Sequence, residues 1–596
     1  MPTRRPAAAL AAGLLLLMLA PPARADHTNP VSPLAPIPPE LDAGVWVTSG
    51  TGTWEVIANL PANPGTDLKT FRVDGDVYAA SGTLGGEPAG HVGQRIVQLT
   101  KGGVVSPRWI ADHGSGACVN GNPSGATGQQ HDVAVDRPVN PRVLMDANDA
   151  TGRCHDPEGG GLEIVDISGL GRYGFEPREL HLTRHVGTSH TVTVDATRPW
   201  VVYSSNATFD GNAWIEVLDI RTCLGPASIP LADKRERCRP KVYRIPFQPE
   251  WSQQRAHDTG ELIEGTESAC HDITAVRGRL YCAALNATLI LDVRNLTDRR
   301  GNVRGTPLAC KVLDGTGTTA KVTDCTAATE PEEGAPPNPA ARGWKLVGTF
   351  NHPGRACAPP PEHVVNCNGN FFVPSLEGVS VAHEADPFLN GQYMLVTDER
   401  GGGIVPPSAS CLPSLDNPIG NGGAHVFDLR DPSKPVYALT PGGDPAVFVG
   451  EAVVPAPTFC DIHVIEPFRG ESRFLAAYYS QGTKIVDFYV DENRRWTFEE
   501  VAAIALPNAN TWAVTNFLTR ANADGTSTYY FMASDIHRGI DVFSWTGPAN
   551  PLAKPRPIAA PPGPGRAADV ALLAVGLVGV PAAAILRRRR RPRTAP

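Results

Sequence analysis

Charged and aromatic residues are scarce in this sequence, at 19% and 7% of its 596 positions. It has no GxSxG, HExxH or CxxC motif and no phosphate-binding glycine loop, which excludes the common serine hydrolases, zincin proteases, paired-cysteine zinc sites and P-loop enzymes. Turn-forming residues are plentiful instead, with 60 Gly and 57 Pro, and this composition argues against long helical bundles. We therefore expect an all-β chain.

Basic residues are too few in the central part of the chain for nucleic-acid binding. The formal charge of the whole chain is −8, but nine arginines lie in the two terminal segments, and without them 44 basic residues remain against 61 acidic ones. The central part then carries a formal charge of −17. A chain this acidic repels phosphate backbones, so no nucleic-acid partner is expected.

The N-terminal end carries an export signal. Residues 1–25 are typical of a secretory signal peptide, because an arginine pair precedes an apolar run that ends in the small-x-small site Ala23-Arg24-Ala25. Residues 26–44 then form a linker. We expect the mature protein to lie outside the cytoplasm.

The C-terminal end is predicted to anchor the chain in the cell membrane. A Pro-rich stalk, 549–566, leads into an apolar stretch, 567–586, which is long enough to span a bilayer as a helix. Five consecutive arginines open the tail 587–596, and such a positive block stays on the cytoplasmic side. The bulk of the chain is then extracytoplasmic and tethered by a single C-terminal helix.

A short apolar pattern recurs seven times along the chain. In each unit, three strands follow one another along the chain. The first is often opened by His, as in His271-Asp-Ile-Thr-Ala-Val, the second is apolar, and the third is the recurring pattern. Four strands per unit in seven units, without helical periodicity between them, predict a seven-bladed β-propeller over residues 45–548. Six of the recurring strands end in Asp and the seventh in Gln, at Asp166, Asp219, Asp292, Asp428, Asp487, Asp541 and Gln98.

The two ends of the propeller are predicted to close the ring. The last unit ends near residue 545 and is followed by Pro-rich sequence that does not suit a fourth strand. Residues 54–59 have the apolar alternation of an outer strand. We expect them to pair with residues 540–545 in a Velcro closure.

These strings resemble the LVIVD-repeat family of bacterial extracytoplasmic β-propellers. Units of that family are similar to the stretch from His271 to Asp292, followed by Asn295-Leu-Thr-Asp298 and by Lys345-Leu-Val-Gly348. The resemblance covers about residues 45–546. It implies a fold and a location, and it carries no shared reaction and no catalytic residue.

The connections of the predicted blades differ in length between the two faces. With strands a to d counted outward from the axis, the a-to-b and c-to-d connections share a bottom face, where only 221–240 and the insertion 297–343 are long. Long loops on a rigid scaffold usually carry binding sites, so the opposite, top face is the candidate ligand-binding surface. Its long d-to-a and b-to-c connections are 110–130, 148–161, 248–270, 351–380, 398–423 and 440–459.

Twelve cysteines, all between Cys118 and Cys460, indicate disulfides in an exported chain. Shared faces or loops favour three pairs: Cys118 with Cys154, Cys223 with Cys238, and Cys310 with Cys325. The partners of the other six stay open. The strand alignment places Cys282 opposite Ile273 and therefore three residues away from Cys270, whereas Cys357 with Cys367 and Cys411 with Cys460 are natural pairs.

Four histidines fall at one position of the first strand in successive blades: His131, His190, His271 and His383, with Leu68, Cys460 and Trp512 in the other three blades. Imidazoles that converge near the axis can bind Zn²⁺ or copper. In the alternative interpretation, each His hydrogen-bonds within its own blade. The four line one side of a wide axis, so we expect at most two to approach a common point, and His271→Ala to cost stability more than activity.

The sequence requires no cofactor, although Zn²⁺, copper and Ca²⁺ are candidates. Oxygen-rich clusters at 146–149 and 522–525 can ligate Ca²⁺ or form turns. We predict a monomeric, non-catalytic propeller that binds an extracellular protein or glycan through its top face. Two alternatives stay open: a His-centred, oxidase-like metal-dependent enzyme, and a Ca²⁺-dependent lactonase-like hydrolase.

Overall fold

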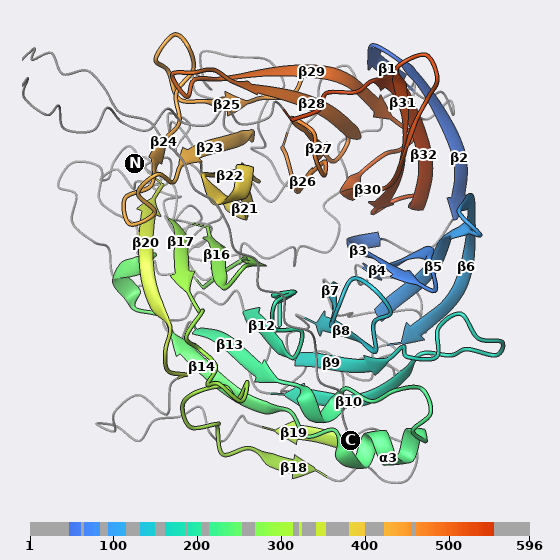
Figure 1. Cartoon of the computed structure of the whole chain (residues 1–596), viewed down its shortest axis with the longest axis vertical. Helices are drawn as coiled ribbons and strands as arrows, with labels where there is room; N and C mark the ends of the chain where they lie inside the picture. The colour runs from blue at the N-terminus through green and yellow to red at the C-terminus, as the bar shows by residue number, and fades with distance from the viewer. Residues whose placement is uncertain are drawn as a thin grey trace, which may run out of the picture. The chain divides into compact units, whose positions relative to one another are not determined.

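Seven sheets of four to six strands surround one axis in the part of the chain that the structure describes (Figure 1). The prediction of an all-β, seven-bladed β-propeller is confirmed. The structure is a computed structural model, and it describes residues 47–60, 65–83, 93–114, 131–148, 161–184, 189–205, 214–252, 269–285, 287–313, 321–324, 341–352, 379, 381–399, 422–451, 453 and 461–552.

In each of the first three blades, four antiparallel strands follow the chain outward from the axis. Blade one contains β3 (Gly65–Val73), β4 (Asp76–Thr83), β5 (Gly93–Lys101) and β6 (Val104–Gly114). Blade two contains β7 (His131–Val135), β8 (Val143–Asn148), β9 (Gly161–Asp166) and β10 (Arg178–Arg184). Blade three contains β11 (Thr191–Val194), β12 (Val201–Ser205), β13 (Trp214–Asp219) and β14 (Lys241–Pro246).

The remaining four blades follow the same order with small variations. Blade four contains β15 (Asp272–Val276), β16 (Arg279–Ala284), β17 (Ala287–Asp292) and β20 (Lys345–Asn351). In blade five, β24 (Val436–Tyr437) and β25 (Val447–Phe448) both pair with β23 (Ala424–Asp428), outside β21 (Ala382–Phe388) and β22 (Tyr393–Asp398). Blade six contains β26 (Ile465–Pro467), β27 (Arg473–Ala477), β28 (Thr483–Val490) and β29 (Trp496–Ala505), and blade seven contains β30 (Thr511–Ala521), β31 (Thr526–Asp535) and β32 (Gly539–Pro548).

Helices are short and lie in the connections. Among the described residues they are η1 (Arg221–Cys223), α3 (Leu231–Arg237), η2 (Pro249–Trp251) and η5 (Leu389–Gly391). None of them is long and apolar enough to cross a membrane, and the predicted spanning segment 567–586 lies outside the described residues.

The middle strands of each blade are almost continuously apolar because both of their faces are buried against neighbouring blades. In β16, Leu280 and Cys282 pack into a cluster shared with blade three, whereas Tyr281 and Ala283 pack into a cluster shared with blade five. Successive side chains of a strand point to opposite faces, so one strand serves two cores. Each fully buried large side chain contributes about 1.5–3 kcal/mol, and this repeated burial holds the blades together.

The N-terminal strand β2 (Thr53–Leu60) closes the ring by pairing with β32. Trp54 lies opposite Trp545, and its ring centroid lies 6.0 Å from that of Phe531 and 5.8 Å from that of Phe543. The predicted pairing of residues 54–59 with 540–545 is confirmed. A shorter strand, β1 (Val47–Gly50), adds to the outer edge of blade six and was not predicted.

The insertion 297–343 contributes strands to a different blade. It follows β17 of blade four, but its strand β19 (Lys321–Asp324) pairs in parallel with β10, so the insertion widens the sheet of blade two. Strand β18 (Lys311–Leu313) then pairs with β19 at the edge of the sheet. The insertion therefore ties blade four to blade two across the outside of blade three.

The recurring Asp at the end of the third strand forms turn hydrogen bonds, as its place in the pattern suggests. The carboxylates of Asp166, Asp219, Asp292 and Asp428 each accept a hydrogen bond from the backbone N–H two residues further on. This geometry stabilises the turn into the outer strand. The recurrence of Asp is therefore structural at these four positions.

The disulfide predictions have mixed outcomes. The pair Cys223–Cys238 is confirmed, and Cys310 is disulfide-bonded, whereas its predicted partner Cys325 lies outside the described residues. Cys270 pairs with Cys282, with Cα atoms 5.3 Å apart, so the expectation that the strand alignment separates them was wrong. Ile273 does lie opposite Cys282, but β15 begins only at Asp272, so Cys270 lies outside the regular register and its side chain reaches that of Cys282. Cys118, Cys154, Cys357, Cys367, Cys411 and Cys460 lie outside the described residues.

Arg473 links blades six and seven from a fully buried position. Its guanidinium donates two hydrogen bonds to Asp487, at 2.6 and 3.0 Å, and one to the carbonyl of Pro548 at 3.0 Å. It also lies 5.0 Å from the ring centroid of Trp545.

We expect Arg473→Ala to lower the free energy of unfolding by about 3–5 kcal/mol, because it leaves a buried carboxylate without its partner. Arg430 provides the control, because its side chain is exposed and its partner Asp428 still pairs with Arg494 when Arg430 is removed. Arg430→Ala is expected to cost less than about 1 kcal/mol. Denaturant unfolding of both variants checks this. Equal losses would show that burial does not decide the contribution of these pairs.

Candidate metal centre

Histidines occupy equivalent backbone positions at the start of the innermost strands. The N–H of His190 donates to Ser205 O at 2.8 Å, that of His271 to Ala283 O at 2.7 Å, and that of His463 to Ala477 O at 2.9 Å. Because the innermost strands of all blades begin near the axis, equivalent side chains from neighbouring blades approach one another. His383 lies on β21, and His131 opens β7 opposite Asn148.

The rings of four of these histidines form a continuous row across blades three to six. The ring centroids are 4.3 Å apart for His190 and His271, 4.6 Å for His271 and His383, and 4.0 Å for His383 and His463. The row ends at Trp512, whose ring lies 4.3 Å from that of His463. All five side chains are buried, so the sequence prediction of a shared position near the axis holds for three of its four histidines, and of the side chain of His131 nothing is described.

His463 was missed because the sequence alignment placed Cys460 at this position of blade six. The backbone hydrogen bond of His463 shows that the position belongs to His463 instead. A signal for it is present in the sequence. His463-Val-Ile-Glu-Pro-Phe repeats the spacing of His383-Glu-Ala-Asp-Pro-Phe, with an acid, Pro and Phe at the same distances from His.

Glu399 is the second side chain that the sequence analysis missed. It follows directly after β22, and its backbone N–H donates to Val381 O at 3.0 Å, which turns the side chain towards the row of histidines. Its carboxylate oxygens lie 3.8 Å from Nε2 of His383 and 3.8 Å from Nε2 of His463. No recurring pattern marks this residue, because it belongs to a connection and not to the repeated strands.

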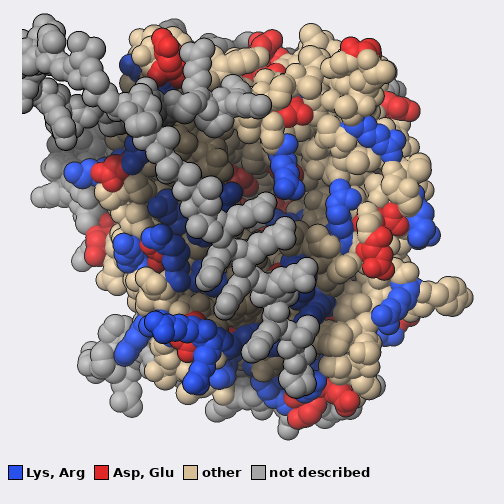
Figure 2. All heavy atoms as spheres, viewed as in Figure 1, with Lys and Arg blue, Asp and Glu red and all other residues tan. Residues whose placement is uncertain are grey.

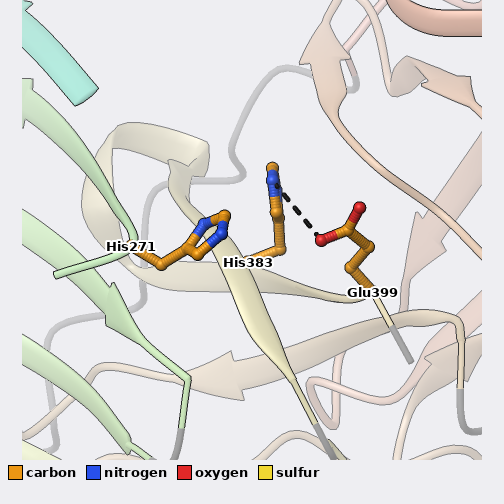
Figure 3. Close-up of side chains that lie close together, drawn as sticks. All are labelled: His271, His383 and Glu399. Carbon is orange, nitrogen blue, oxygen red and sulfur yellow. Dashed lines mark ion pairs between the residues drawn. The ribbon is translucent and has the colours of Figure 1, made fainter. Parts of the chain in front are cut away.

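His271, His383 and Glu399 converge on one point. One ligand atom from each, an imidazole nitrogen or a carboxylate oxygen, lies within 4.8 Å of the other two. Figure 3 shows the ring of His383 between His271 and the carboxylate of Glu399. Two of the four predicted histidines thus belong to this group, and Nε2 of a third, His190, lies 3.2 Å from Nε2 of His271.

The electrostatic surroundings of this point favour a cation. Burial is the main cause that raises the pKa of Glu399 well above its usual value, and the charges of Asp461, Asp67 and Asp398 raise it further. These three neighbouring charges are all acidic. An ionised carboxylate buried in this way is costly unless a positive charge compensates it.

Tyr479 holds Glu399 from the other side. Its hydroxyl donates a short hydrogen bond to Oε1 of Glu399. Tyr479 has a backbone φ of 41°, a left-handed conformation that a bulky residue rarely adopts. Mutual hydrogen bonds with the backbone of Thr511, at 2.9 and 3.1 Å, hold it there. The fold thus keeps a strained residue in place where its hydroxyl meets the carboxylate.

A second group of acids lies on the axis, carried by the innermost strands of five blades. These side chains are half-buried, and they repel one another. After burial, the charge of Asp67 is the next cause that raises the pKa of Asp132, and the charges of Asp386, Asp272 and then Asp67 raise that of Glu384. Several of them are held by neighbouring blades: Thr191 donates to Asp272 at 2.7 Å, and Ile465 N donates to Glu384 at 2.8 Å. The group consists of Asp67, Asp132, Asp272, Glu384, Asp386 and Glu466.

We expect Glu466→Gln to stabilise the propeller at alkaline pH. Burial raises the pKa of Glu466 from 4.5 to about 7, so ionisation costs folding free energy that sets in above pH 4.5 and is complete above pH 7. The gain is therefore expected to be absent near pH 4 and about 1–3 kcal/mol at pH 8. Thermal melts across this range check it, with Glu471→Gln, which lies outside the axial group, as the control. A gain of equal size at pH 4 and pH 8 would contradict the account.

The candidate Ca²⁺ clusters are occupied by hydrogen bonds of the protein itself. Asp146 accepts a hydrogen bond from Gln94 at 2.8 Å, and Asp524 accepts two from Thr526 in a hairpin turn. The turn interpretation therefore accounts for the second cluster. Asp149 lies outside the described residues, and so do most residues of the top-face connections.

Comparisons with known proteins find distant similarity to solved structures. No family model matches the chain, and no curated protein matches it. Among solved structures it is similar to the propeller domain of Cps50 (Swd1) from Myceliophteria thermophila, at 10% identity, covering 83% of this chain and 99% of that chain with a TM-score of 0.37. It is also similar to the periplasmic gluconolactonase PpgL of Pseudomonas aeruginosa, at 10% identity, 78% and 93% coverage and a TM-score of 0.35.

A third similar structure is a putative 6-phosphogluconolactonase from Bacteroides uniformis, at 10% identity, 77% and 88% coverage and a TM-score of 0.35. These likenesses do not bear on activity. The function has to be argued from the site.

Proposed function

We propose that the protein is a metal-dependent enzyme whose single divalent transition-metal ion is held by His271, His383 and Glu399. The convergence of their three ligand atoms within 4.8 Å carries this proposal. Two imidazoles and one carboxylate with an open position are a ligand set found in catalytic zinc sites and in non-haem iron sites. The acidic surroundings of Glu399 support it, because a divalent cation would offset the negative charges of Asp461, Asp67 and Asp398.

The residues around the three ligands have roles that suit such a centre. The ion would supply a Lewis acid, or redox chemistry if it is iron or copper. Tyr479 fixes the carboxylate of Glu399, and a hydrogen-bonded ligand keeps its orientation better than a free one. His463, next to Glu399 and next to His383, can take up or release a proton beside the centre. His190, with Nε2 3.2 Å from Nε2 of His271, fixes the orientation of that ring.

Metal analysis of the purified chain tests the proposal. After exhaustive chelation, the protein is supplied with Zn²⁺, Fe²⁺, Cu²⁺ or Ca²⁺ in turn, and bound metal is measured after desalting. We expect one transition-metal ion per chain and no Ca²⁺. A chain that retains none of the four ions would overturn the proposal.

A metal-free result would favour the other function that the sequence predicts, a binding protein acting through its top-face loops. In that case the ectodomain would bind an extracellular protein or glycan, and the row of histidines would serve packing alone. Export by the signal peptide, the C-terminal membrane anchor, the monomeric state and membership of the LVIVD-repeat family are proposals common to both functions. Reconstitution of the full chain into liposomes tests the anchor.

A further inference from the structure

The bottom face carries a cluster of exposed basic side chains in blades three to five. In the view of Figure 2, Lys and Arg side chains gather over β13, β14 and β17. The sequence as a whole is acidic, so this local excess is a feature of the face and not of the composition. The exposed members are Arg237, Lys241, Arg277, Arg294, Arg299, Arg300, Arg304, Arg342, Lys345, Arg430 and Lys434, which we call the basic face.

Only some side chains of the basic face form ion pairs. Hydrogen bonds from Asn302 and, to a smaller extent, the charge of Arg300 lower the pKa of the neighbouring Asp298. Arg294 pairs with Asp292 and Arg430 with Asp428. No such ion pair is found, within the described residues, for Arg299, Arg300 and Arg304. The backbone segments that carry them lie side by side, since Arg342 N donates to Arg304 O at 2.9 Å, and the side chain of Arg221 donates to the carbonyl of Arg300 at 3.4 Å.

The chain leaves the propeller on this same face. Leu552 N donates to Gly470 O at 3.0 Å, and Ser472 N donates to Asn550 O at 2.9 Å. Gly470 and Ser472 belong to the turn between β26 and β27, an a-to-b connection, and the basic face lies on connections of the same side. Whatever follows Leu552 therefore starts from the face that carries the arginines.

The sequence after Leu552 connects this face to a predicted membrane span. Only 14 residues separate Leu552 from the apolar stretch 567–586. Even fully extended they reach about 50 Å, and a tether of this length gives the propeller a high local concentration at the membrane surface. A cluster of basic side chains is attracted by anionic lipid headgroups, and tethering multiplies that attraction.

We propose that the basic face docks on the anionic headgroups of the membrane that anchors the chain. The exit of the chain beside Gly470 and the excess of exposed basic side chains on the same face point to this orientation independently of each other. The top face, with the row of histidines beneath it, then faces away from the membrane and stays accessible to solutes. The proposal does not depend on the metal centre.

Vesicle sedimentation tests the docking surface without the anchor. A fragment of residues 26–552 contains all seven sheets, both strands of the closing pair and the complete compact unit that ends at Leu552. It is mixed with phosphatidylcholine vesicles with and without 30% phosphatidylglycerol, where we expect binding only to the anionic vesicles and loss of binding at high salt. Arg299→Glu together with Arg300→Glu is expected to weaken this binding at least about tenfold.

The matched control makes the same change in net charge as the Arg299 and Arg300 double variant, but on the outer strands of blades one and two. Arg108→Glu with Arg178→Glu should bind anionic vesicles within about twofold of the unchanged fragment. Equal binding to both vesicle types, or equal losses in both double variants, would overturn the proposal. Binding of a soluble acidic polysaccharide but not of anionic vesicles would also overturn it, and would assign the surface to a glycan.

Discussion

A chain that begins at residue 65 is expected to lose about 5 kcal/mol or more of unfolding free energy, or to lose its cooperative transition altogether. The truncation removes β2, which pairs with β32 from Thr53 to Leu60, and the contacts of Trp54 with Phe531, Phe543 and Trp545. It opens the ring and exposes the long apolar edge of β32. Differential scanning calorimetry of the truncated and full-length ectodomains measures the loss.

Two shorter truncations separate closure from the mere loss of residues. A chain that begins at residue 45 keeps both N-terminal strands and is expected to melt like the mature chain. A chain that begins at residue 52 loses only β1, a four-residue strand at the edge of blade six, and should lose much less than the chain that begins at residue 65. An unchanged melting curve for the chain that begins at residue 65 would contradict the closure by β2.

His383→Ala is expected to abolish stoichiometric metal binding while the propeller still folds. His383 lies between the other two groups, with Nε2 3.8 Å from Glu399 and its ring 4.6 Å from that of His271, so its loss leaves the group with a single imidazole. We expect metal affinity to fall at least a hundredfold, more than the tenfold to hundredfold typical of groups that only support a ligand. Glu399→Gln should weaken binding similarly, because it keeps the shape and removes the charge.

His425 provides the matched control for His383. It is equally buried in the same blade, but its ring neighbour is Tyr437, with ring centroids 6.0 Å apart, and it does not belong to the convergent group. His425→Ala is therefore expected to lower stability and to keep one metal ion per chain. If both variants lost stability equally and neither changed the metal content, the earlier expectation that these histidines serve stability would replace the metal centre.

The fold could be predicted from the sequence because the same strand pattern recurs in every blade. Seven copies of an apolar strand, a turn-forming Asp and an inner strand allow weak local signals to reinforce one another, even where Asp is replaced by Gln98. The closing strand could also be predicted. The residues around Trp54 have the apolar alternation of an outer strand, and the last unit is the one that lacks its own outer strand. The path of the insertion could not, because pairing of β19 with β10 depends on a distant blade and leaves no local periodicity.

The candidate site could be predicted only as far as it follows the repeat. His190, His271 and His383 were found because they recur at one position, but His463 was hidden by the unequal spacing of its blade. Glu399 comes from a connection, where neither alternation nor recurrence marks a residue. The strand alignment gave the wrong expectation for Cys270 and Cys282, because it does not describe the path of the chain before the strand starts.

X-ray absorption spectroscopy of the metal-loaded chain tests the proposed centre most directly. The account predicts two imidazole nitrogens and at least one carboxylate oxygen at about 2.0–2.2 Å from the ion, and one imidazole fewer in His383→Ala. It also predicts no sulfur at about 2.3 Å, because no described cysteine is free. A first shell of oxygen alone, or one that is the same in the variant, would contradict a metal centre at His271, His383 and Glu399.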